Sequence, residues 1–486
     1  MYFIYWERQG FYMVIIHNNP YNPEKEALVT NQDNNICQKY TGCYGIAMDI
    51  GTTTIAASLF SLADRKFCGN ITETNMQAKY GADVMMRIMN SNMGKASLLH
   101  NIIITQAEDI IERLSSSICT RDKVIKMAVT GNTTMCHLFL DKDLSGMAGT
   151  PFKTAYTGSI SLKGSENGFQ KFPDINIYVM PGIAAHTGAD AVSVICSQKL
   201  YQTDKIQLAV DIGTNAEIIL NNRGNVYACS AAAGPAFEGK GVKCGIRAGN
   251  GAVNGIKINR LAGNIVLDVI DTSSNNGSNN RQNSQDTLIP KGICGSGLVD
   301  AIAELLKAGV LKTDGYLMDK EEALKNGVNT SIAERIHKNN EGNYFVFYEE
   351  NDLYNKQQYS SRHKDIIITQ KDIRNIQLAK AAIQAAAEVL LETAGITLDN
   401  VDEIKIAGVF GKFIHPKQAV LIGLYPGTDN IEFIGNAAGN GIAQALFDQN
   451  FRKLALKYST ETRHIELASE KSFQDKFLNA MELKKW

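Results

Sequence analysis

Two stretches of the chain share the same succession of apolar and polar positions. Residues 46–54 (IAMDIGTTT) and 208–216 (LAVDIGTNA) each begin with an apolar run and continue into Asp-Ile-Gly-Thr. An apolar run that ends in a glycine-containing turn is typical of a buried strand. Apolar positions resume at 55–60 and at 217–220, as they do in a β-hairpin. The two copies lie about one domain length apart, and this self-similarity predicts two halves of one duplicated fold.

The remaining sequence alternates between helical and strand patterns. Five helices are predicted, over residues 97–114, 186–198, 295–308, 372–394 and 439–447, the last being the final patterned helix. Strands are predicted over 124–129, 177–180 and 401–407, and a short strand or strand pair is expected in the first sixteen residues. This alternation favours an α/β fold.

The pattern also suggests how the chain divides. We expect an N-terminal extension (1–44), a first domain (45–205), a second domain (206–450) and a C-terminal tail (451–486). Two stretches of the second domain are interpreted as insertions. Residues 273–287 are polar and rich in Gly, Ser and Asn, which predicts a flexible loop, and residues 313–364 are charged and weakly periodic.

Composition adds few constraints. A chain of 486 residues is long for one hydrophobic core, so two core-bearing domains are expected. The net charge of −1 does not indicate a nucleic-acid or anionic-membrane surface, and no uncharged apolar run is long enough to span a bilayer. The nine cysteines contain no C-x-x-C pair, which favours reduced cytosolic thiols over disulfides, a zinc site or an iron–sulfur cluster. We expect a cytoplasmic protein.

The paired Asp-Ile-Gly-Thr turns predict a phosphate site. Glycine lets the backbone approach a phosphate closely, and exposed N–H groups and Thr hydroxyls donate hydrogen bonds to its oxygens. A carboxylate at the end of the strand can hold Mg²⁺, commonly through water. The candidate phosphate-binding residues are Gly51, Thr52, Thr53, Gly213, Thr214 and Asn215. Asp49 and Asp211 are the candidate catalytic carboxylates and Mg²⁺-holding residues.

Five motifs in order resemble those of the acetate and sugar kinase, Hsp70 and actin superfamily. They are Asp49–Thr54 and Asp211–Asn215 for the two phosphate loops, His186–Val192 and Gly435–Gly441 for the two connecting helices, and Ile406–Gly411 for the adenosine motif. The resemblance implies two RNase H-like domains around a cleft that binds ATP and Mg²⁺. It also implies that Gly408 and Gly411 contact the nucleotide.

A closer resemblance, over about residues 45–446, is to the reductive activators of corrinoid proteins. It is carried by Tyr80–Val84, Gly131–Met135, Cys229–Gly239, Cys244–Ala248 and Ile422–Pro426. In that family ATP hydrolysis drives electron transfer that returns Co(II) corrinoid to Co(I). The resemblance implies a corrinoid protein partner and a homodimer, and places Gly234 and Glu238 near ribose or phosphate. Glu238 as a solvated loop residue is the alternative.

The sequence departs from this family in its electron carrier. Members typically carry an N-terminal plant-type [2Fe–2S] domain or clusters elsewhere, whereas here about 44 residues precede the nucleotide fold and no run of four cysteine ligands exists. We therefore expect no iron–sulfur cluster within this chain. Either a separate ferredoxin-like donor supplies electrons, or the protein has another task.

Glu217, which follows the second loop, is the candidate for orienting the attacking water, because a general base must reach the nucleophile. Its alternative is a strand residue paired with a cation. The segment 234–241 (GPAFEGKG) is close to the P-loop motif. However, glycine occupies the position at which the motif has a Ser or Thr that binds Mg²⁺.

Three functional hypotheses follow. The leading hypothesis is an ATPase that couples domain closure to activation of a redox partner. A small-molecule kinase of the same superfamily and a non-catalytic, nucleotide-gated scaffold are the alternatives.

Overall fold

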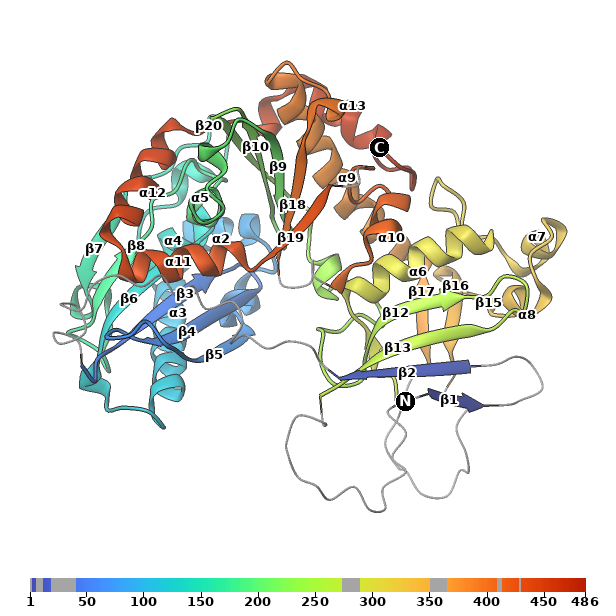
Figure 1. Cartoon of the computed structure of the whole chain (residues 1–486), viewed down its shortest axis with the longest axis horizontal. Coiled ribbons are helices and arrows are strands. Elements are labelled where there is room, and N and C mark those ends of the chain that lie inside the picture. Colours follow the sequence, from blue (N-terminus) through green and yellow to red (C-terminus); the bar gives the residue numbers. More distant parts are fainter. Residues whose placement is uncertain are drawn as a thin grey trace.

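The computed structural model describes residues 2–5, 12–18, 41–272, 289–349, 365–408, 413–427 and 430–486. The elements form two lobes that meet around helices α5 (Ala189–Ser197) and α11 (Ala437–Phe447), with further sheets extending the second lobe (Figure 1). Within the described residues, no helix has both the length and the apolar character needed to cross a membrane.

The first lobe is built on a six-stranded sheet. Its strands, in spatial order, are β5 (Phe67–Thr74), β4 (Thr54–Ser61), β3 (Tyr44–Ile50), β6 (Val124–Gly131), β8 (Asn176–Val179) and β7 (Ile160–Lys163). β3, β4 and β5 are joined as antiparallel hairpins, whereas β6 pairs in parallel with β3, and β8 with β6. Helices α2 (Val84–Asn90), α3 (Ala96–Ser115) and α4 (Thr133–Phe139) belong to the same lobe.

The second lobe repeats this arrangement. Its central sheet has the order β19 (Ile431–Gly435), β18 (Glu403–Ala407), β9 (Ile206–Asp211), β10 (Ala216–Asn222), β11 (Asn225–Ala231) and β20 (Arg463–His464). β9, β10 and β11 are antiparallel neighbours, and β18 and β19 add in parallel beside β9. Both lobes therefore share the strand order third–second–first–fourth, with a further parallel strand beside the fourth. The predicted α/β duplication is confirmed.

Two further sheets extend the second lobe. One contains β1 (Tyr2–Tyr5), β2 (Tyr12–Asn18), β13 (Ile265–Asp271), β12 (Ala252–Ile258) and β14 (Gly292–Ile293), and α6 (Gly295–Ala308) packs on β12. The other contains β15 (Ile336–Asn339), β16 (Gly342–Tyr348) and β17 (Ile366–Thr369). The expected N-terminal strand pair is confirmed, and its second strand pairs in parallel with β13, far along the chain.

The structure describes part of the second predicted insertion and none of the first. Residues 273–287 lie outside the described residues, as do 350–364 of the second insertion. The described part of the second insertion is folded: it contains α7 (Lys320–Lys325), α8 (Thr330–Ala333), β15 and β16. Phe345 and Phe347 of β16 are fully buried in the core of the second lobe. The boundaries between the predicted domains stay predictions.

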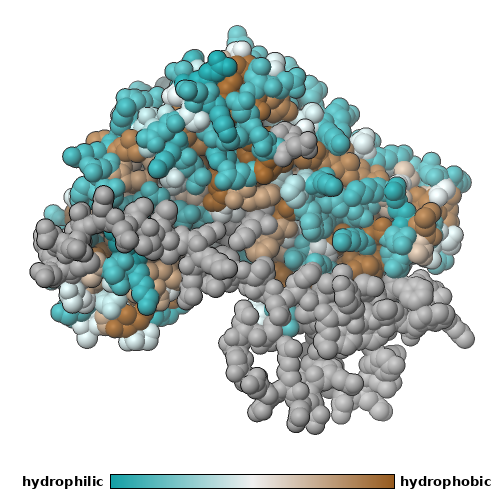
Figure 2. Space-filling view, in the orientation of Figure 1, coloured by the Kyte–Doolittle hydropathy of each residue, from teal (hydrophilic) through white to brown (hydrophobic). Residues whose placement is uncertain are grey.

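The predicted helices all occur, α6 with its predicted ends and the others with shifted ends, and the prediction that 439–447 is the last helix is wrong. The long helix α9 (Gln370–Thr393) begins at the Thr369 cap, whose hydroxyl accepts from the Asp372 backbone. α10 (Pro416–Leu421) follows, and beyond α11 come α12 (Gln449–Glu461) and α13 (Lys471–Asn479). Hydrophilic residues cover most of the upper part of the face in Figure 2, where α13 lies. The mainly polar sequences of α12 and α13 make their apolar faces hard to recognise.

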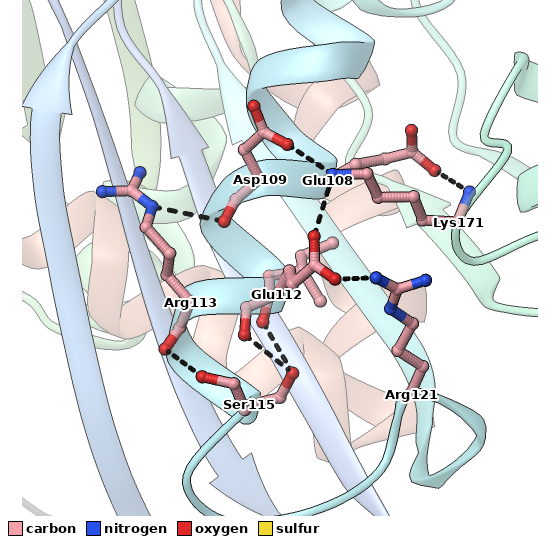
Figure 3. Close-up of polar contacts among 9 residues, drawn as sticks. Glu108, Asp109, Glu112, Arg113, Ser115, Arg121 and Lys171 are labelled. Carbon is pink, nitrogen blue, oxygen red and sulfur yellow. Dashed lines mark hydrogen bonds and ion pairs between the residues drawn. The ribbon is translucent and has the colours of Figure 1, made fainter.

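Charged side chains on the outside of α3 fasten it to the segment before β8 (Figure 3). Lys171 Nζ lies 2.6 Å from Asp109 Oδ1 and 2.8 Å from Glu112 Oε2. Arg121 also pairs with Glu112. Such partly exposed pairs contribute about 0–1 kcal/mol each, so the buried inner face of α3 carries most of its attachment.

Helices α5 and α11 cross at small residues between the two central sheets. Ser193 Oγ donates to the Ala438 carbonyl at 2.7 Å, and Ser197 Oγ donates to the Ala437 carbonyl at 3.0 Å. At the crossing, a Cβ on Gly441 would lie 2.6 Å from the Ser193 carbonyl oxygen. Glycine is required here because the two backbones approach more closely than a methyl group allows.

We expect Gly441→Ala to lower the free energy of unfolding by about 1–3 kcal/mol, because an overpacked contact must push the helices apart. Without that clash, alanine would favour a helix. Gly158→Ala is the control, since its Cβ would meet nothing within 4 Å. Urea unfolding of both variants measures the difference, and equal stabilities would contradict a close helix crossing.

Candidate functional site

The structure brings the two predicted phosphate loops into direct contact. The first loop connects β3 to β4, and the second connects β9 to β10. The hydroxyl oxygens of Thr53 and Thr214 lie 2.7 Å apart, and both residues are buried. The duplicated turns therefore face each other across the junction of the lobes, as the resemblance implies.

Backbone and side-chain hydrogen bonds define the shape of the first loop. The Gly51 N–H donates to the Thr54 carbonyl at 2.9 Å. The Asn75 amide nitrogen donates to the Gly51 carbonyl at 2.9 Å, and the Asn75 backbone N–H donates to the Thr53 carbonyl at 2.9 Å. Asn132, from the motif that leads into α4, donates to the Thr52 hydroxyl at 2.8 Å.

A buried arginine completes this support. Arg87 on α2 has no exposed surface and donates to the Thr52 carbonyl, and also to the Gly81 carbonyl at 3.1 Å. Burial lowers the pKa of Arg87 to about 10. Sequence reasoning missed this residue and Asn75. A signal was present, because a lone arginine shares a helix face with Val84 and Ile88, both buried.

Four carboxylates form an acidic cluster behind the loops: Asp49, Asp190, Asp211 and Glu217. Burial, and then the charges of Asp190 and Asp211, raise the pKa of Asp49 to about 8. Burial and the charge of Asp190 raise the pKa of Asp211 to about 7. The same two causes raise the pKa of Glu217 well above its ordinary value. Carboxyl groups gathered in one buried place take up protons near neutral pH unless a cation among them favours the ionised form.

Two members of the acidic cluster have further contacts. Glu217 Oε1 accepts from the Ser230 hydroxyl at 2.7 Å, while its buried Oε2 has no hydrogen-bond partner among the described residues. Within the same part of the chain, no ion pair of Glu217 with a cation is found, so its role stays a prediction. Asp190 accepts from the Ala191 N–H at 2.9 Å in the first turn of α5, so it stabilises the helix start as well as facing the other carboxylates.

The donor set fits a hard divalent cation. Mg²⁺ prefers carboxylate oxygens and water, and the raised pKa values of Asp49 and Asp211, with the unpartnered Glu217 oxygen, mark a place where positive charge would be stabilised. Within the described ranges, no three His, Cys, Asp or Glu side chains are grouped as ligands of one ion.

The predicted residues of the second lobe gather around its loop. Thr214 Oγ1 donates to Glu238 Oε1 at 2.6 Å, and the Gly234 N–H donates to the Thr214 carbonyl at 2.8 Å. Glu238 is thus held against the loop rather than freely solvated. Gly213 and Asn215 occupy the same turn, with a Gly213 Cβ position 3.2 Å from the Asn215 carbonyl oxygen.

Gly408 follows β18 and lies against the second loop. Its φ is +105°, and a Cβ there would lie 2.7 Å from the Ile212 carbonyl oxygen and 3.5 Å from Asp211 Oδ1. β18 pairs with β9 so that Ala407 is opposite Asp211, which explains this placement. Gly411, the other predicted nucleotide contact of this segment, lies outside the described residues.

The doubled strand order, with two Asp-Ile-Gly-Thr turns facing each other between the lobes, defines a protein of the actin, Hsp70 and sugar-kinase (ASKHA) class. Residues 44–203 match the family model described as the RACo middle region. Residues 205–486 match the model described as the C-terminal domain of RACo, the ASKHA domain. The chain belongs to the RACo family, as the resemblance of its motifs indicated.

Comparisons with individual proteins agree with this family assignment. The chain is 33% identical to the corrinoid activation enzyme RamQ of Eubacterium limosum over 447 residues, which cover 91% of this chain and 70% of that enzyme. It is 23% identical to a [Co(II) methylated amine-specific corrinoid protein] reductase of Methanosarcina barkeri, covering 91% of this chain and 77% of the relative.

A solved structure of a reductive activator for corrinoid, iron–sulfur protein is also similar, with a TM-score of 0.78 and 32% identity. The match covers 91% of this chain and 66% of that one, slightly less than two thirds of its length.

We expect Gly408→Ala to weaken ATP binding at least about tenfold, because a Cβ there would displace the Ile212 carbonyl and with it the second loop. Gly224→Ala is the matched control: its φ is +91°, so alanine is strained there as well, but no atom lies within 4 Å of the added Cβ. Titration with a fluorescent ATP analogue measures both affinities. Equal affinities in the two variants would argue against nucleotide binding beside Gly408.

Proposed function

We propose that this protein binds ATP with Mg²⁺ between its lobes and couples ATP hydrolysis to the reduction of a Co(II) corrinoid protein to Co(I). The observation that carries the proposal is the contact between Thr53 and Thr214, which joins two phosphate loops of opposite lobes in a member of the RACo family. A nucleotide held by both loops favours the closed arrangement, and hydrolysis releases it.

Each loop residue has a role in this proposal. Gly51 and Gly213 let the backbone approach the phosphates, and Thr52, Thr53, Thr214 and Asn215 donate hydrogen bonds to them. Asp49 and Asp211 hold Mg²⁺ through water, and the ion, when bound, neutralises charge on the phosphates. In the second lobe, the nucleotide is proposed to lie against Gly234, Glu238, Gly408 and Gly411.

Glu217 is proposed to orient the attacking water. Its side chain is fixed by the Ser230 hydroxyl, and its second oxygen is free to accept a proton or a hydrogen bond. A raised pKa makes a carboxylate a stronger proton acceptor while it is ionised, and a cation bound nearby would favour the ionised form. Positioning and charge neutralisation, rather than covalent chemistry, account for most of phosphoryl-transfer catalysis.

The redox step moves one electron. A ferredoxin-like donor loses one electron and the cobalt of the partner gains it, so no atoms are transferred between the proteins. We propose a separate donor protein for this electron, a corrinoid protein as the acceptor and a homodimer as the working form. The names of the relatives support the acceptor, since one is a corrinoid activation enzyme and another reduces a Co(II) corrinoid protein.

The test is phosphate release from the purified protein with Mg-ATP, with and without a methylated amine-specific corrinoid protein in its Co(II) form. We expect the corrinoid protein to stimulate release, and Asp211→Asn to lower the stimulated rate at least about 100-fold, since it removes charge that holds the cation. Asp204→Asn, an exposed carboxylate close in sequence, is the control. Absorbance of Co(I) with reduced ferredoxin present reports the electron transfer.

The alternatives predict different outcomes. ATP binding without phosphate release in either condition would sink the ATPase hypothesis and favour a nucleotide-gated scaffold. ADP formed without an equal amount of free phosphate, in the presence of a small-molecule acceptor, would instead favour a kinase.

A further inference from the structure

Arg247 reaches across the junction of the lobes to the first phosphate loop. It lies in the segment between β11 and β12 of the second lobe, and its Nη2 donates to the Thr54 hydroxyl at 2.5 Å. The backbone just before it is firmly held, because the Ile246 N–H donates to the Ile293 carbonyl at 3.0 Å and the Ile293 N–H to the Cys244 carbonyl at 2.7 Å. The Arg247 side chain is therefore exposed, while the backbone next to it is held in place by hydrogen bonds.

Three consecutive threonines of the first loop are each contacted by different residues. Thr52 is held from within its own lobe by Arg87 and Asn132. Thr53 contacts Thr214 of the second loop, and Thr54 contacts Arg247. Two of these three attachments come from the second lobe, so the first loop joins the lobes in addition to the crossing of α5 and α11.

Three cations around this loop, Arg87, Lys240 and Arg247, take part in none of the ion pairs found among the described residues. Burial lowers the pKa of Lys240, and the positive charges of Arg247 and Arg87 add to this effect against the charge of Glu238. These cations are close enough to repel one another, and an anion between them would relieve the repulsion.

The two phosphate loops therefore separate opposite charges. The carboxylates Asp49 and Asp211 lie at the strand ends behind the loops, whereas Arg87 and Arg247 contact Thr52 and Thr54. A magnesium nucleotide has the complementary distribution, with a cation on one side and phosphate oxygens on the other. Arginine suits the phosphate side because its planar fork of donors matches phosphate geometry.

We propose that Arg247, supported by Lys240, contacts the terminal phosphate of ATP from the second lobe, so that a triphosphate joins the lobes more firmly than a diphosphate does. This inference rests on the proposed function, since it assigns a nucleotide-sensing role within the same site. Arg247 would exchange its contact with the Thr54 hydroxyl for the phosphate, or share it between both.

The experiment compares affinities for a fluorescent ADP and for a fluorescent imido analogue of ATP, both with Mg²⁺. We expect Arg247→Ala to weaken binding of the ATP analogue about 10- to 100-fold, the equivalent of one or two charge-assisted hydrogen bonds, and to change ADP binding less than about threefold. Arg247→Lys keeps the charge but not the fork, so an intermediate loss is expected. Lys240→Ala should act in the same direction as Arg247→Ala.

Arg260→Ala is the matched control, because Arg260 is an exposed arginine of the same lobe that donates to the Lys307 carbonyl at 3.1 Å. It should leave both affinities unchanged. Equal losses for ADP and the ATP analogue in Arg247→Ala would mean that Arg247 is a strut between the lobes, and no loss would mean that it is a surface residue. Either result overturns the inference while the proposed function stands. Failure of the unmodified protein to bind either nucleotide overturns both.

Discussion

Burial of four carboxylates beside two facing turns is the constraint on which the other features of the site depend. Asp49 and Asp211 end the central strands of their lobes, and Asp190 and Glu217 approach them from α5 and β10. Burial raises the pKa of all four carboxyl groups, and the charge of neighbouring carboxylates raises the pKa of Asp49, Asp211 and Glu217 further. Such an arrangement costs stability unless a cation is available, so it is retained at sites where binding a cation matters.

The helix crossing explains how the two turns are held in register. α5 follows the last strand of the first sheet along the chain, α11 follows β19 of the second, and α11 packs back on β3 and β6 of the first sheet. The small residues at the crossing, including Ser193 and Gly441, let the two backbones approach each other. A small change in the angle between these helices would move the two loops relative to each other, which is the kind of motion that a nucleotide held by both could control.

Two arginines contact the first loop from opposite lobes. Arg87 approaches Thr52 from within the first lobe, and Arg247 approaches Thr54 from the second. One of these cations is fully buried and the other is exposed, so they have different parts to play. The buried arginine holds the loop from within its own lobe, whereas the exposed one is proposed to change partners when a nucleotide binds. Under that proposal, the residues that hold the nucleotide differ from the residue that responds to its terminal phosphate.

The sequence alone determined the duplicated strand and turn, the α/β class, the centres of the main helices and the family. These features are local, because a strand, a turn or a helix face repeats over a few residues and can be recognised from composition and spacing. The motifs also contain most of the residues that gather at the junction, including Thr53, Thr214, Glu238 and Gly408.

Only the tertiary structure decided which of these residues meet. The N-terminal strands join β13, the last two helices fold back beside α5 and α9, and Arg247 contacts Thr54 across the lobes. None of these contacts leaves a periodic signal, because each depends on pairing between segments that lie 80 or more residues apart or on a polar side chain whose partner lies in another element. Arg87 was visible as an odd residue on an apolar helix face, but the sequence contains nothing that places that face against Thr52.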